Sequence, residues 1–275
     1  MGLSVNTNVA SLTAQANLSK STVRFNASME RMSTGLRINR AGDDAAGLVV
    51  SELQKKAISG LSGAIKNIER AVSAVQTAES GLGEIGNVLL KIRGIAVDAA
   101  NNGAQDTGTL AASQAEITTL LGSIDRISDT TKFGTKNLLD GTFSAQQFQI
   151  GAFSSETATL SITDSDSTAL AINAIDVTTA AGATSALTDI DAAIGTVTTA
   201  RGTLGAFQVG TLDATKNSNM SQLQNIQAAE SSLRDTDYQK EIATYTSEQV
   251  RQQVASSVLG IANQSTQAIV QLLRG

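Results

Sequence analysis

Two short motifs in this sequence have residue types and spacing that could bind a ligand. The segment Gly81-Leu82-Gly83-Glu84-Ile85-Gly86 fits the G-x-G-x-x-G pattern of dinucleotide-binding loops, which needs a strand before it and a helix after it. Here it lies inside a run of helical periodicity, which favours close helix packing through small residues. Asp164 and Asp166 begin like a calcium loop but lack its Gly and its bidentate Glu, which favours a solvated turn.

A third polar cluster surrounds the carboxylate pair Asp43 and Asp44. Paired carboxylates can perform acid–base catalysis, but no His and no second polar cluster supports that chemistry here. Arg37, Asn39 and Arg40 precede the pair closely enough to form a polar turn with it. We therefore expect a structural turn in which Asp43 or Asp44 caps the helix that follows.

The absence of Cys and His excludes much chemistry. It removes thiol nucleophiles, disulfides, thiolate and imidazole metal ligands and the usual general base near pH 7. The net charge is −5, and the basic residues are scattered among the acidic ones without forming a stripe. We predict a non-enzyme with no cofactor, no metal site and no nucleic-acid partner.

The hydropathy pattern predicts no membrane partner either. No stretch of about 18 apolar residues could form a transmembrane helix. The first residues, from Met1 to Asn6, lack the basic and apolar regions of a cleaved secretory signal. These features alone would place the chain in the cytoplasm.

The elements that must position any site are predominantly helical. The chain has no Pro, the residue that breaks helix interiors. Alternating steps of three and four run from Ile58 to Ala96, as in a coiled coil or helix bundle, and similar spacing recurs over Leu110–Ser128 and Leu187–Leu204. Two-residue alternation at Phe148–Ile150 and Ala158–Ile162 predicts a short hairpin. We predict a mainly α fold: a long antiparallel, coiled-coil helical rod formed by the two halves of the chain, with a small β-hairpin region at its middle.

Both ends of the chain carry helical apolar stripes without charge. The first 19 residues and residues 252–273 contain no charged side chain, and neither end has enough apolar surface to fold alone. We expect these ends to be disordered in the monomer until subunits pack together. The predicted assembly positions on the two terminal helices are Leu18, Phe25, Met29, Met32, Leu36, Val250, Val254, Val258, Ile261 and Leu272.

Two segments closely resemble the amino-terminal signature of bacterial flagellins. They are Arg31-Met32-Ser33-Thr34-Gly35-Leu36-Arg37-Ile38-Asn39 and Ala41-Gly42-Asp43-Asp44-Ala45-Ala46-Gly47-Leu48. The carboxy-terminal pattern of that family is similar to Leu233-Arg234-Asp235-Thr236-Asp237-Tyr238 and to the closing Leu272-Leu273-Arg274. The resemblance covers about 140 residues at the start and 75 at the end, and it marks Arg31, Gly35, Arg37, Asn39, Asp43 and Asp44 as a family-signature turn.

The resemblance implies a domain organisation. Residues 1–44 with 233–275 would form a terminal-helix inner core domain, and residues 45–140 with 184–232 a helical-bundle domain. Residues 141–183 would be a short β and loop segment, without the large outer domains that flagellins commonly carry.

The resemblance also implies a function and partners. The chain would be exported, would polymerise with itself into the extracellular flagellar filament for motility, and would need no cleaved signal. Its other partners would be an export chaperone, the type III export apparatus, and the filament cap and hook-junction proteins. The family's contacts with Toll-like receptor 5 fall on Lys91, Ile95 and Glu116. The alternative is a hook–filament junction protein; a zinc peptidase insert is excluded because H-E-x-x-H requires His.

Overall fold

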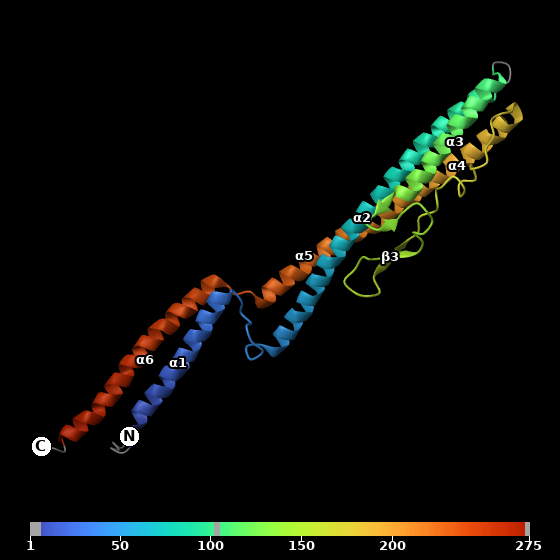
Figure 1. Ribbon diagram of the computed structural model, residues 1–275. Helices are drawn as coiled ribbons and strands as arrows, with labels where there is room; N and C mark the ends of the chain where they lie inside the picture. Colours follow the sequence, from blue (N-terminus) through green and yellow to red (C-terminus); the bar gives the residue numbers. More distant parts are fainter. Residues whose placement is uncertain (1–6, 102–104, 273–275) are drawn as a thin grey trace. The chain divides into compact units, whose positions relative to one another are not determined.

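The computed structural model describes residues 7–101 and 105–272, and of residues 265–272 only the backbone. Long helices dominate it, and the short strands lie in the middle of the chain (Figure 1). This confirms the predicted mainly α class with a small β-hairpin region. In chain order the elements are α1 Val9–Thr34, α2 Ala45–Ala99, α3 Thr107–Thr130, β1 Lys132–Phe133, β2 Lys136–Asn137, β3 Gln146–Gln149, β4 Thr157–Leu160, α4 Ala180–Phe207, η1 Gln208–Asp213, α5 Ala214–Arg234 and α6 Tyr238–Leu272.

The described residues form two compact units. The terminal unit comprises the chain up to Lys56 together with the residues from Ile226 onward, and the central unit comprises Ala57–Asn225. The boundaries predicted from the sequence, at residues 44/45 and 232/233, stay a prediction about domains. α1 and α6 lie side by side in the terminal unit, and α2, α3 and α4 lie side by side in the central unit (Figure 1).

Local sequence accounts for the helix ends. Asn8, Asp106 and Thr179 each accept a hydrogen bond from a backbone N–H in the first turn of α1, α3 and α4, which satisfies a donor that the helix cannot satisfy itself. α1 stops at Gly35, whose φ of 73° is the left-handed conformation that glycine adopts at low cost.

The core of the central unit is built on α2 and contains two sets of residues spaced by seven. The first set was predicted and is buried throughout: Leu61, Ile68, Val75, Leu82, Leu89 and Ala96. The second set is Ala64, Ala71, Ala78, Ile85, Ile92 and Ala99, also buried. The alternating steps of three and four that begin at Ile58 predict a second row at Ile58, Ile65 and Val72 instead, and these residues are only half-buried. That prediction was wrong because small alanines allow closer helix packing than their modest hydrophobicity suggests.

α3, α4 and the middle of the chain pack against this face of α2. Ile117 and Ile124 of α3 and Ile190 of α4 are fully buried in the same cluster. The irregular segment after α3 adds Leu138, Leu139, Phe143, Ile162, Ile172 and Val177. The Gln114 side chain fastens this segment to α3, because its amide donates to Ile175 O over 2.9 Å and accepts from Val177 N over 2.8 Å.

The predicted hairpin is present. β3 and β4 pair antiparallel with Phe148 opposite Ala158, and residues 150–156 connect them. A second, shorter pair, β1 with β2, was not predicted. It turns through Gly134, whose φ is 63°, and two residues on each side are too few to show alternation.

No helix among the residues that the structure describes is long and apolar enough to cross a membrane.

Leu82 and Leu90 on α2 provide a matched test of this core. Leu82 is fully buried and Leu90 is 58% exposed. We expect Leu82→Ala to lower the free energy of unfolding by about 2–5 kcal/mol, because it removes buried methyl groups and leaves a cavity. Leu90→Ala should change it by less than about 0.5 kcal/mol. Urea unfolding followed by circular dichroism measures both, and equal losses would contradict the core assignment.

Candidate assembly surface

The signature turn joins the two ends of the chain. Leu36 forms an antiparallel bridge with Asp235. Arg37 N donates to Arg234 O over 2.6 Å, and Thr236 N donates to Gly35 O over 2.9 Å. The Tyr238 hydroxyl at the start of α6 also donates a hydrogen bond to Met32 O near the end of α1, over 3.3 Å. α1 therefore ends where α6 begins.

The two carboxylates of the turn have separate roles. Asp44 Oδ1 accepts from Gly47 N over 2.8 Å, so Asp44 caps α2. Asp43 Oδ2 accepts from the backbone N–H groups of Arg40 and Asn39 over 3.0 and 3.1 Å and closes the turn. These bonds, Arg40 first, lower the pKa of Asp43 because they favour its charged form.

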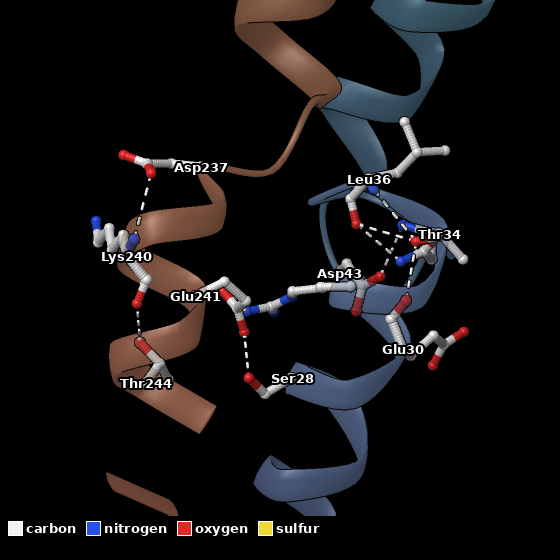
Figure 2. Close-up of polar contacts among 11 residues, drawn as sticks. Ser28, Glu30, Thr34, Leu36, Asp43, Asp237, Lys240, Glu241 and Thr244 are labelled. Atoms are coloured by element: carbon white, nitrogen blue, oxygen red, sulfur yellow. Dashed lines mark hydrogen bonds and ion pairs between the residues drawn. The ribbon is translucent and has the colours of Figure 1, made fainter. Parts of the chain in front are cut away.

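The remaining signature residues stabilise backbone and charge within the same turn. The Arg37 guanidinium donates to Leu233 O over 2.5 Å, and Asn39 Nδ2 donates to Leu36 O over 2.9 Å. Arg31 lies 4.0 Å from Glu241 across the helix pair. Figure 2 shows Leu36 and Asp43 near the end of α1, with Glu241 on the neighbouring helix α6. The structure thus brings five of the predicted signature residues to one turn and places Arg31 in the last helical turn of α1 before it.

Arg234 is the residue of this turn that sequence reasoning missed. Its side chain is buried, and it donates to Ile38 O, Ser51 Oγ and Glu52 Oε1 over 3.2 to 3.3 Å. Ser51 is fully buried and also donates to Glu230. A single Arg in a polar segment is usually solvated, so only its match to the carboxy-terminal family pattern could have drawn attention to it.

α1 and α6 form an antiparallel pair along one continuous seam. Asn8 contacts Ala262 at one end, and Ser28 contacts Glu241 near the other. Between them the Phe25 and Tyr245 rings lie 4.9 Å apart, and Gln252 donates to Thr22. The buried seam residues of α1 are small: Ala14, Ser21 and Ser28.

The predicted assembly residues divide between two surfaces. Leu18, Phe25, Met32 and Leu36 are half-buried, and Met29 is 46% exposed. Four residues of α6 are 47–66% exposed, and we call them the apolar stripe: Val250, Val254, Val258 and Ile261. At about 100° per residue the apolar stripe lies beside the face of α6 that carries Glu241 and Glu248 and meets α1, and Val258 is the stripe residue nearest to that face. The side chain of Leu272 lies outside the described residues.

Most of the apolar stripe borders a shallow groove of about 290 Å³ between the two helices. Val250, Val254 and Val258 form its α6 wall together with Arg251 and Ala255, and Ala14 and Asn17 form its α1 wall. The lining is mainly apolar and open to solvent, so it suits a neighbouring helix better than a small polar ligand.

The three predicted receptor residues lie on α2 and α3. Lys91 and Glu116 are exposed, whereas Ile95 is half-buried and packs against the central core. Arg93, beside them, is paired: its Nε lies 2.6 Å from Asp191 Oδ1. This hydrogen bond raises the pKa of Arg93, which stays charged.

Neither ligand-like motif of the sequence forms a binding site. The G-x-G-x-x-G segment lies inside α2, with no strand before it. Close packing is confirmed only at Gly81, where an added Cβ would lie 2.8 Å from Leu139; it is wrong for Gly86, which has open space. Asp164 and Asp166 accept backbone hydrogen bonds within their own turn. Among the described residues no three acidic side chains gather as metal ligands.

Two family models match most of the chain. Residues 5–144 match the bacterial flagellin N-terminal helical region, and residues 187–273 match the bacterial flagellin C-terminal helical region. The paired terminal helices and the signature turn lie within these two regions. The class of protein is therefore that of helical flagellar proteins whose two ends fold together.

Comparison with individual proteins agrees. The chain is 40% identical over 274 residues to a flagellin of Halalkalibacterium halodurans, covering 98% of this chain and 99% of that one. The crystal structure of Bacillus cereus flagellin matches with a TM-score of 0.50 and 29% identity over 60% of this chain and 94% of that one. A Vibrio parahaemolyticus protein described as hook-associated matches with a TM-score of 0.59 but only 14% identity, over 70% of this chain and 100% of that one.

This chain belongs to the bacterial flagellin family.

The turn geometry predicts the titration of Asp43. Because its folded pKa is lowered, its contribution to stability is complete above its unfolded pKa of about 3.9 and is lost as the pH falls through the lower folded pKa. The amide resonances of Asn39 and Arg40, which donate to Asp43, should shift with a midpoint below about 3.9 in an NMR pH titration. Asp43→Asn should abolish that shift; a midpoint at or above 4 would contradict the turn.

Proposed function

We propose that this flagellin is a structural subunit that polymerises with itself into the bacterial flagellar filament and so serves motility. One observation carries the proposal: the described part of the terminal unit has almost no apolar core of its own. Its buried apolar residues are Ala14 and Ile38, whereas the central unit buries all the rest. Large apolar side chains are instead exposed along α1 and α6, among them Val9, Leu12, Val23 and the apolar stripe.

Burial against other subunits supplies what the terminal unit lacks. Exposed apolar surface gains roughly 25 cal/mol per Å² when it leaves water, and contiguous exposed apolar patches on a soluble protein mark interaction sites. A helical polymer covers the same patch in every subunit. Head-to-tail contacts between identical subunits generate such an open filament when their rotation does not close a ring. The terminal pair is therefore the proposed assembly surface, and the signature turn fixes its two helices to each other.

The alternative, a hook–filament junction protein, is less well supported. The hook-associated neighbour shares only 14% of its sequence, which speaks for a common fold alone. The flagellin of Halalkalibacterium halodurans matches along nearly its whole length. A filament subunit therefore remains the proposal.

The family also suggests a route and further partners. We infer that the chain leaves the cell through the flagellar type III export apparatus, held beforehand by an export chaperone, and acts in the extracellular filament. Contacts with the filament cap and the hook-junction proteins would follow at the two ends of the polymer. These partners rest on the family resemblance. The proposed role is structural, with no catalysis assigned.

Val258 in the apolar stripe provides the test of assembly. Val258→Asp should abolish filament formation, because the interface would bury a carboxylate without a partner. The same change at Leu18 acts on the seam instead and should also prevent assembly. Negative-stain electron microscopy after addition of a kosmotropic salt or filament seeds measures the result.

A matched control separates assembly from folding. Gln253 is exposed and lies off the apolar stripe, so Gln253→Asp should leave filaments intact. The thermal unfolding of the central unit should be the same in all variants. Long uniform filaments from Val258→Asp would overturn the assignment of the apolar stripe to subunit contact.

Recognition by Toll-like receptor 5 stays a prediction that rests on the resemblance. Lys91 and Glu116 are exposed and available to a receptor, while Ile95 offers only part of its side chain. The double substitution Lys91→Ala and Glu116→Ala should lower the signal from receptor-reporter cells at least tenfold if these residues make the contact. Glu84→Ala, which changes an exposed acid of α2 outside the predicted contact, is the control. Equal signals from the double variant and from the control would argue against recognition through Lys91 and Glu116.

A further inference from the structure

Charged residues are buried at the contact between α1 and α6, where apolar residues would be expected. Glu241 and Glu248 of α6 are only 8% and 6% exposed. They are seven residues apart and face Ser28 and Ser21 of α1, which are also seven apart and 2% and 8% exposed. The helix pair thus contains two stacked Ser–Glu layers. Seven residues further outward, Ala14 and Ala255 line one groove.

Each layer is held by hydrogen bonds and an arginine. The Ser28 hydroxyl donates to Glu241 over 2.5 Å, as Figure 2 shows, and Arg31 lies 4.0 Å from the same carboxylate. The Ser21 hydroxyl lies 3.4 Å from Glu248, which also accepts from Arg251 over 3.1 Å. In both layers the small serine leaves room for the longer acid.

A buried carboxylate is a poor way to stabilise a helix pair. Well-packed apolar residues at such positions are usually as stabilising or more so, and the best-attested benefit of a buried polar group is the choice of partner and register. We propose that Glu241 and Glu248 are the specificity-determining residues of the terminal pair: they direct α6 to α1 and prevent α6 from pairing with the α6 of a second copy.

The alternatives that these acids oppose are concrete. Two α6 helices joined through this face would bring carboxylate against carboxylate in either orientation, without the serine hydroxyls. A slip of one heptad would place Glu248 opposite Ala14, which offers no side-chain donor. The unlike layers, Ser–Glu, Ser–Glu and then Ala–Ala, therefore fit only one arrangement. This selection matters because the exposed apolar stripe already attracts other helices.

The absence of cysteine makes the proposal directly testable in the full-length chain. Gln252 lies at the seam, 3.3 Å from Thr22. Gln252→Cys alone reports α6–α6 pairing as an interchain disulfide, and Thr22→Cys with Gln252→Cys reports the native pair as an intrachain one. Both are read on non-reducing gels after mild oxidation, in the native background and with Glu241→Leu and Glu248→Leu.

We expect the native background to give the intrachain link and few dimers. The Leu pair should raise the interchain disulfide at least fivefold and lower the intrachain link. Glu241→Gln with Glu248→Gln, which keeps size and hydrogen bonding but removes charge, should give a smaller increase. Glu84→Leu with Asp129→Leu, which adds apolar surface at exposed sites outside the pair, should match the native background.

Three results would overturn the inference. The first is an unchanged dimer level in the Leu and Gln backgrounds. The second is loss of the intrachain link without a gain in dimers, which would make the acids stabilising but not selective. The third is the absence of the intrachain link from the native chain, oxidised both before and after filament seeds are added. The inference rests on the proposed assembly surface, but the disulfides are read on gels whether or not filaments form, so failure to form filaments is a separate outcome.

Discussion

The terminal unit depends on one short antiparallel contact between segments almost 200 residues apart in the chain, the bridge of Leu36 with Asp235. The entropy cost of closing so long a loop grows only slowly with its length, so a few backbone hydrogen bonds and the buried Arg234 can hold it. α1 ends and α6 begins at this contact, which sets the register from which their seam continues. The bridge thus adds a backbone contact to the side-chain contacts of the seam between the two helices.

Much of the fold follows from sequence because its signals are local and periodic. The heptads of α2, the hairpin from Phe148 to Ala158 and the carboxylate turn were all predictable. The second α2 row was missed because four of its six residues are alanine, which hydrophobicity ranks below the half-buried Ile58 and Ile65. The sequence also does not predict which of the terminal apolar residues lie in the seam and which lie in the apolar stripe, because that depends on which face of α6 contacts α1.

The two units use opposite kinds of interior. The central unit buries Leu, Ile and Val between helices and carries the stability of the fold. The terminal unit buries Ser21, Ser28, Glu241 and Glu248, so its interior sets orientation more than it adds stability. A subunit that combines with many copies of itself benefits from this separation. Its exposed apolar stripe belongs to the terminal unit, while the central unit keeps an apolar core of its own.

The six-residue π-helix η1 has a consequence for how the length of this family's chains can vary. A π turn contains more residues than an α turn, which is the signature of one residue inserted into an existing helix. The wide turn absorbs that residue locally, and Leu204 before it and Leu212 within it both remain buried. Deletion of one residue here should let the segment run as a continuous α-helix with the same faces inward, so the π-helix confines to one turn a change of length that would otherwise rotate the side chains that follow out of the core.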